Sequence, residues 1–119
     1  MRDFRSLAVW QKAHALALAV YRVSGSFPPE ERFGLTSQVR RAVLSVPTNI
    51  AEGCGRQAEG DFRRFLDIAA GSASETEYLL VLAGDLGYLP PQLAADLLVQ
   101  VQEVKRMLSA FTARLRTPC

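Results

Sequence analysis

One stretch, residues 33–56, constrains the fold most, because it combines a helical apolar pattern with a proline in the middle of that pattern. Its apolar residues recur every three or four positions, as on one face of an α-helix. They are Leu35, Val39, Ala42, Val43, Val46 and Ile50. Pro47 removes a backbone donor and clashes with the carbonyl of Val43, so we expect a bend or a break in the helix there.

Three further segments show the helical period, and short loops rich in glycine and proline separate them. We expect these helices over residues 7–24, over residues 59–86, and from Pro90 and Pro91 onward. No strand pattern or internal repeat competes with this interpretation. Four helices joined by short loops predict an all-α fold, an antiparallel up-down four-helix bundle that forms a single domain over residues 1–119.

Residue types at the ends of these segments predict how the helices begin and end. Ser6 and Thr36 are suitable N-caps for the first and second helices. We expect Gly53 or Gly55 to end the second helix in a left-handed turn, and Gly87 to end the third.

The first expected helix has an apolar face wider than one packing partner requires. Two neighbouring stripes of apolar and small residues cover it. One contains Leu7, Trp10, Ala13, Ala17, Val20 and Ser24, and the other contains Val9, Leu16, Val23 and Phe27. A face of this width predicts contacts both inside the bundle and with another molecule.

The third expected helix contains a run of small residues, AAGSAS, from Ala69 to Ser74. Small side chains let a neighbouring backbone approach closely. Gly71 costs about 1 kcal/mol of helix propensity relative to alanine, so we expect a packing reason for it.

Composition narrows the class of protein. Of the 119 residues, 49% are hydrophobic and 22% are charged, which is typical of a packed core rather than of a disordered chain. The net charge of +2 is weaker than that of a dedicated nucleic-acid-binding domain. Cys54 and Cys119 form no CxxC motif, and we find no signal-peptide pattern and no apolar run of about 20 residues. We therefore expect a cytoplasmic protein with reduced thiols and no membrane contact.

No group of residues in the sequence predicts catalysis. His14 is the only histidine, and a zinc site would need two or three further nitrogen or thiolate ligands at a suitable spacing. Cys54 has no base that the sequence assigns to it. Gly53, Gly55 and Gly60 resemble a phosphate loop only faintly, because no strand precedes them and no GK[ST] ending follows. We expect a protein that is not an enzyme and that has no metal and no cofactor.

Five polar residues suggest a shared environment. They are Arg41, Ser45, Asn49 and Glu52, on one side of the second expected helix, and Glu75 on the third. One interpretation is a buried or half-buried Arg–Glu network that fixes the helix register and satisfies the groups left without partners by Pro47. The other interpretation is a binding pocket. We favour the structural network, because one face of a bundle can close over it.

Arg56, Arg63 and Arg64 lie around the expected turn between the second and third helices. Repeated in every subunit of a ring, they would form a basic rim that binds RNA or DNA without regard to sequence. Acidic residues such as Glu59 and Asp61 alternate with them, which slightly favours a charge-balanced, solvated surface. Both interpretations remain open at this point.

Several motifs together resemble one family of bacterial proteins. They are VWQKA at residues 9–13, FPPEERFGLTSQVRRA at 27–42, SVPTNIAEG at 45–53 followed by Arg56, FLDIAAGSASE at 65–75, and LGYL at 86–89. Their order and spacing resemble the four-helix-bundle proteins first noticed as products of intervening sequences in 23S rRNA genes, and the resemblance covers nearly the whole chain. It implies an up-down four-helix bundle and a ring of five subunits. A related branch, the accessory variability determinant of diversity-generating retroelements, binds a reverse transcriptase and nucleic acid through a basic surface.

Two hypotheses for function follow. The first is a non-enzymatic homo-oligomer, a pentamer, that scaffolds a protein or RNA partner. The alternative is a sequence-independent RNA- or DNA-binding protein that is accessory to a reverse transcriptase. An electropositive surface on the ring would favour the alternative, and a balanced surface would favour the scaffold.

Overall fold

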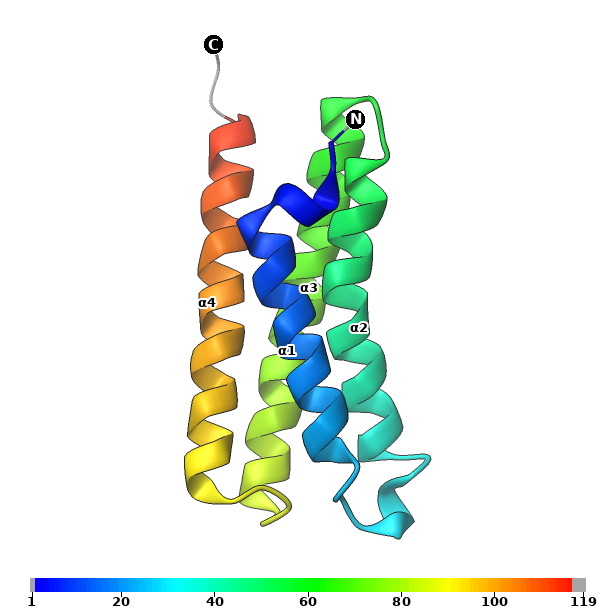
Figure 1. Cartoon of the computed structure of the whole chain (residues 1–119), viewed down its shortest axis with the longest axis vertical. Helices are drawn as coiled ribbons and strands as arrows, with labels where there is room; N and C mark the ends of the chain where they lie inside the picture. Colours follow the sequence, from blue (N-terminus) through cyan, green and yellow to red (C-terminus); the bar gives the residue numbers. More distant parts are fainter. Residues whose placement is uncertain (1, 117–119) are drawn as a thin grey trace.

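The computed structural model describes residues 2–116, which form four long helices and two short 3-10 turns. The helices are α1 (Ala8–Ser24), α2 (Leu35–Cys54), α3 (Glu59–Asp85) and α4 (Pro91–Arg116), and the short turns are η1 (Phe4–Ser6) and η2 (Pro29–Glu31). Figure 1 shows the helices side by side along the long axis of a molecule that measures 49 × 23 × 20 Å. The predicted all-α four-helix bundle is confirmed.

Each helix packs against two neighbours in a cyclic order. The backbones of α1 and α2, α2 and α3, α3 and α4, and α4 and α1 come together, whereas the diagonal pairs of helices within the described chain do not. Consecutive helices run in opposite directions (Figure 1). The turn between α2 and α3, residues 55–58, lies beside the N-terminal segment, where the amide of Arg2 donates to the carbonyl of Cys54 at 2.9 Å. We call this end of the molecule the α2–α3 end.

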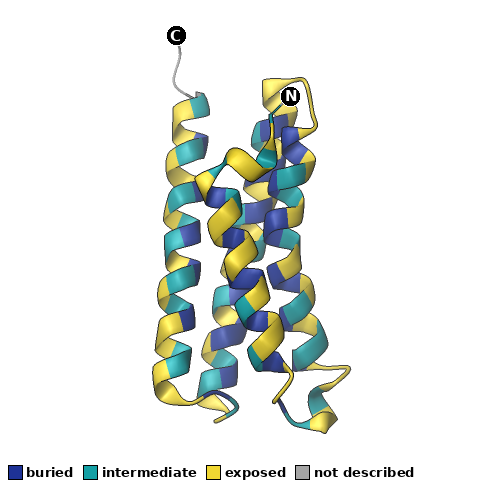
Figure 2. Cartoon of the chain, viewed as in Figure 1, coloured by how far each residue is buried: buried dark blue, intermediate teal, exposed yellow. Residues whose placement is uncertain are grey.

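The apolar faces of the four helices meet in one core. Every apolar residue predicted for the core face of α2 is buried. Buried residues, dark blue in Figure 2, lie on the sides of the helices that face one another. Within the core, the ring of Phe62 on α3 meets the ring of Phe111 on α4 edge to face, with centroids 5.4 Å apart. On α1, Leu7 just before the helix and Trp10 are only half-buried, so the wide apolar face of this segment extends beyond the core.

Helix α2 continues through Pro47, so of the predicted bend or break, the break is wrong. Pro47 is buried, and its neighbours Val46 and Ile50 are fully buried. Proline costs about 3 kcal/mol of helix propensity in the interior of a helix. The burial of this apolar face outweighs that cost, so the helix continues.

Two predicted N-caps are also wrong. Helix α1 begins after Leu7, because Ser6 belongs to the preceding turn and its hydroxyl donates to the carbonyl of Asp3 at 2.7 Å. Helix α2 begins after Gly34 rather than Thr36, and a carboxylate oxygen of Glu31 accepts from the amide of Leu35 at 3.1 Å. A side chain from the preceding turn thus replaces the expected cap.

The predicted end of α3 at Gly87 is confirmed. Gly87 has a φ of +78°, and the amide of Tyr88 donates to the carbonyl of Ala83 at 2.9 Å. The amide of Gly87 donates to the carbonyl of Gly84 at 3.0 Å, which completes a Schellman motif.

The glycines at the end of α2 serve a different purpose from the one predicted. Neither Gly53 nor Gly55 has a positive φ. Gly53 is buried, and a Cβ added there would lie 2.9 Å from the Cβ of Phe65 and 3.1 Å from Cδ1 of Phe62. Glycine is therefore needed because α2 and α3 approach closely, and no left-handed turn is involved.

Candidate interaction surfaces

The predicted buried or half-buried Arg–Glu network is wrong. Glu52 and Arg41 are exposed in the folded chain. The carboxylate of Glu52 pairs with Arg56, four residues further along α2, at 3.1 Å. Glu52 lies in the last turn of α2, at the end of the bundle, where its side chain remains 49% exposed. Glu52 therefore needs no burial to find a partner.

Uncharged side chains of α2 and α3 form hydrogen bonds in part of the region predicted for that network. The hydroxyls of Ser45 on α2 and Ser72 on α3 lie 2.8 Å apart. The side-chain amide of Asn49 donates to the carbonyl and to the hydroxyl of Ser45, each at 2.8 Å. These half-buried groups fix the register between α2 and α3 without burying a charge.

The alternative of a binding pocket is met in part by a groove between α2 and α3 of about 520 Å³. Arg41, Ser45 and Glu75 line it, whereas Asn49 and Glu52 do not. Glu75 is exposed and accepts a long hydrogen bond of 3.5 Å from Gln38. The structure therefore brings three of the five predicted residues together on a surface.

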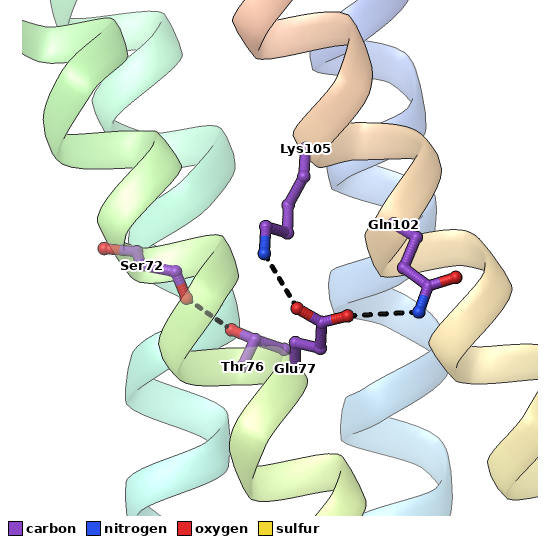
Figure 3. A network of polar contacts seen from close by, with 5 residues as sticks. All are labelled: Ser72, Thr76, Glu77, Gln102 and Lys105. Atoms are coloured by element: carbon purple, nitrogen blue, oxygen red, sulfur yellow. Dashed lines mark hydrogen bonds and ion pairs between the residues drawn. The ribbon is translucent and has the colours of Figure 1, made fainter.

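Sequence reasoning missed a polar contact between α3 and α4, which Figure 3 shows. The ammonium of Lys105 lies 2.8 Å from one carboxylate oxygen of Glu77, and the amide of Gln102 donates to the other at 3.1 Å. These hydrogen bonds, first from Lys105 and then from Gln102, lower the pKa of Glu77 below its ordinary value of 4.5. Glu77 lies one residue beyond Thr76, whose buried hydroxyl donates to the carbonyl of Ser72. The contact ties α3 to α4 at mid-length and has no catalytic geometry.

The three arginines predicted to form a basic rim lie at the α2–α3 end, and two of them lie over the same aromatic ring. The guanidinium carbons of Arg56 and Arg64 lie 5.0 Å and 4.6 Å from the ring centroid of Phe65. Both arginines are exposed, whereas Arg63 is half-buried. Cation–π contacts of this kind hold a guanidinium in place.

Arg2 adds a positive charge that the sequence pattern did not reveal. Its guanidinium lies 4.1 Å from the ring centroid of Phe62 and pairs with Glu59 at 2.7 Å. Because Arg2 is far from this turn in the sequence, only the folded chain brings it there. Glu52 and Glu59 pair with Arg56 and Arg2, so the rim is charge-balanced in part.

A groove lies along the outside of α1 and α2, and we call it the α1/α2 groove. It has a volume of about 770 Å³ and is lined by Phe4, Trp10, His14, Leu44, Pro47, Thr48, Ala51, Glu52, Gly55 and Arg56. The rings of Trp10 and His14 are stacked, with centroids 4.9 Å apart and planes 7° apart. Leu44 is 49% exposed beside them. The groove thus combines an apolar floor with an ion pair at one end.

A second exposed surface lies on the outer side of α3, and we call it the α3 outer face. Its residues follow helical spacing and are all exposed: Asp61, Arg64, Ile68, Gly71, Glu75 and Tyr78. A Cβ added at Gly71 would meet no atom within 4 Å. The predicted packing reason for Gly71 is therefore absent within the described part of the chain.

Residues 2–116 give little support for metal binding, for a nucleophilic cysteine or for a membrane span. No group of three or more histidine, cysteine, aspartate and glutamate side chains in this range is placed to hold a metal ion. Cys54 is 1% exposed, and burial raises the pKa of its thiol, which disfavours the nucleophilic thiolate. None of the described helices is long and apolar enough to span a bilayer.

Comparison with known proteins agrees with the fold. No curated protein matches the chain. A crystal structure of a protein of unknown function from the S23 ribosomal protein family of Bacteroides thetaiotaomicron VPI-5482 is similar, with 25% sequence identity and a TM-score of 0.80. The match covers 92% of this chain and 100% of that chain. The model of the 23S rRNA-intervening sequence protein family matches residues 5–110. The chain, with its four-helix bundle, therefore belongs to the 23S rRNA-intervening sequence protein family.

Proposed function

We propose that this protein is a non-enzymatic, homo-oligomeric bundle that serves as a scaffold for a protein or RNA partner. The observation that carries the proposal is the α1/α2 groove, where Trp10, His14 and Leu44 form an aromatic and apolar surface outside the core. Exposed apolar surfaces rimmed by polar residues are typical of interaction sites. The α3 outer face, with Ile68 and Tyr78, provides a second such surface on a different side of the bundle.

The first test is the mass of the protein in solution. Light scattering coupled to gel filtration at micromolar concentration should give about five times the chain mass of 13.1 kDa, the number that the family resemblance implies. A mass that corresponds to a smaller closed ring would agree with the scaffold proposal and would change only the number of subunits. The mass of a single chain would contradict the proposal.

A second candidate function is sequence-independent binding of nucleic acid. What favours it is the placement of Arg56 and Arg64 over Phe65, with Arg2 nearby at the same end. Several copies would present these guanidinium groups together, and the phosphate contacts would add up. One chain offers only two or three such contacts.

Salt dependence tests the second candidate. Anisotropy of a labelled duplex of arbitrary sequence and of a single-stranded RNA should report binding at low salt that weakens steeply as salt rises. On duplex DNA the log–log slope should be about −0.9 per neutralised phosphate. Replacing Arg63 and Arg64 with alanine should flatten the slope, whereas replacing Arg22 and Arg32, far from the rim, should not. Absence of binding at low salt would remove this candidate and leave the scaffold.

A further inference from the structure

We propose that the α1/α2 groove of one copy binds the α3 outer face of the next copy. This inference rests on the proposed self-assembly and names the two surfaces that would make it. The argument uses the relative heights of residues along the bundle, their charges, and the open space beside Gly71.

Two contacts fix the heights of α2 and α3. Ser45 and Ser72 lie at the same height, because their hydroxyls are 2.8 Å apart. Nearer the α2–α3 end, Gly53 lies level with Phe65, as the close approach of their Cβ positions requires. Because α2 runs toward this end and α3 runs away from it, Arg56 lies beyond Glu52, and Asp61 lies beyond Arg64.

The charges of the two surfaces match at these heights. In a ring whose symmetry axis lies along the bundle, each residue faces residues of the neighbour at its own height. Exposed Arg56 would then face the neighbour's Asp61, and Glu52 would face the neighbour's Arg64. Opposite charges would meet at both positions, which gives the contact its direction and register.

The apolar residues of the two surfaces match one turn further along. Ile68 lies one turn from Ser72 toward the α2–α3 end, within about one residue of the height of Thr48 in the groove. Gly71 lies two residues along the axis, about 3 Å, nearer the α2–α3 end than Leu44, because α2 and α3 run in opposite directions from the level of Ser45 and Ser72. A protruding leucine needs an opposing surface without a side chain, and Gly71 provides one.

The proposed contact joins two different surfaces, so it is heterologous. Every copy carries both surfaces, and each copy can therefore bind one neighbour on either side. Heterologous contacts of this kind close into a ring when the rotation between copies divides a full turn. The arrangement also supplies the packing reason for Gly71 that a single chain lacks.

Two substitutions, each on one surface, test this pairing. Leu44→Arg blocks the groove, and Gly71→Arg blocks the α3 outer face and raises helix propensity. Each variant alone should form no ring, because each lacks one of the two surfaces. Mixed in equal amounts, they should form a heterodimer of twice the chain mass, through the one groove and the one outer face that remain intact. Ala95→Arg, on the exposed surface of α4, is the matched control and should assemble like the native chain.

The outcomes separate this inference from the proposal on which it rests. A monomeric native chain would contradict the self-assembly itself. An oligomeric native chain with both variants still oligomeric would overturn the pairing. Loss of assembly in Leu44→Arg alone would indicate a symmetric contact between two grooves, and would also overturn it. Circular dichroism of both variants must show the helical content of the native chain, and Leu44→Ala and Gly71→Leu replace any variant that fails this check.

Discussion

A single missing side chain at Gly53 sets the distance between α2 and α3. The Cβ atoms of Phe65 and of an alanine at position 53 would lie 2.9 Å apart, and neither atom can rotate away. Gly53→Ala should therefore lower the free energy of unfolding by about 1–3 kcal/mol, although alanine is the better helix former. Chemical denaturation at fixed protein concentration measures this change.

Gly60→Ala is the matched control for that prediction. Gly60 lies in the first turn of α3, and a Cβ added there would meet no atom within 4 Å. The free energy of unfolding of Gly60→Ala should rise, or remain within about 1 kcal/mol of the native value. Equal destabilisation by both substitutions would show that backbone propensity, and not the close approach, explains the effect.

The Glu77–Lys105 pair should make stability depend on pH in one direction. The pKa of Glu77 is lowered in the folded chain, so the carboxylate contributes stability above its ordinary pKa of 4.5. That contribution is lost as the pH falls through the lower, folded pKa. Lys105→Met should cost about 0.5–1 kcal/mol at neutral pH, since both side chains are partly exposed.

Unfolding of Lys105→Met and of the native chain should therefore be compared across the acid range. The difference in free energy should persist at neutral pH and shrink well below pH 4.5. Lys12→Met is the control, because its pair with Glu103 is longer, at 3.4 Å, and more exposed. A difference for Lys105→Met that is constant with pH would indicate that packing of the lysine stem, and not the ion pair, is responsible.

At the scale of an element, α2 tests how packing and helix propensity compete. Pro47→Ala restores a backbone donor and gains about 3 kcal/mol of helix propensity. It also removes two buried methylene groups, at about 0.8 kcal/mol each. The variant should be more stable by about 1 kcal/mol in denaturation experiments. Thr48→Ala, at the next and exposed position, should change stability by about 0.5 kcal/mol or less. A less stable Pro47→Ala would indicate that the proline shapes the helix.

The helical period predicts buried faces well and predicts contacts between helices poorly. A core stripe such as the one on α2 depends only on the residues of that helix, so the bundle could be derived from the sequence. The environment of Glu52 could not, because its exposure depends on how far the neighbouring helices extend past it. The pair of Glu77 and Lys105 depends in the same way on the register that the turn after α3 imposes.

The candidate surfaces also combine features that the sequence predicts with features that only the folded chain shows. Arg56 and Arg64 were found from their position beside a turn, whereas Arg2 reaches the same end only through the folded N-terminal segment. The width of the apolar face on α1 predicted a contact outside the bundle. It did not predict that the groove would be completed by Leu44 and Pro47 of α2, because sequence spacing carries no information on which helices are neighbours.

At the scale of the whole molecule, Trp10 gives the protein an optical signal of its own. It is the only tryptophan, it is half-buried, and it lines the α1/α2 groove. An indole that loses contact with water emits at shorter wavelength, so a neighbour seated in the groove should shift the emission to the blue.

Dilution should reverse the shift with the same midpoint as the fall in mass, because both follow the same association equilibrium. Gly71→Arg, which leaves the α1/α2 groove unaltered, supplies the spectrum of the single chain. Emission that stays constant while the mass falls would place the contact elsewhere, and either result needs no dye and no tag.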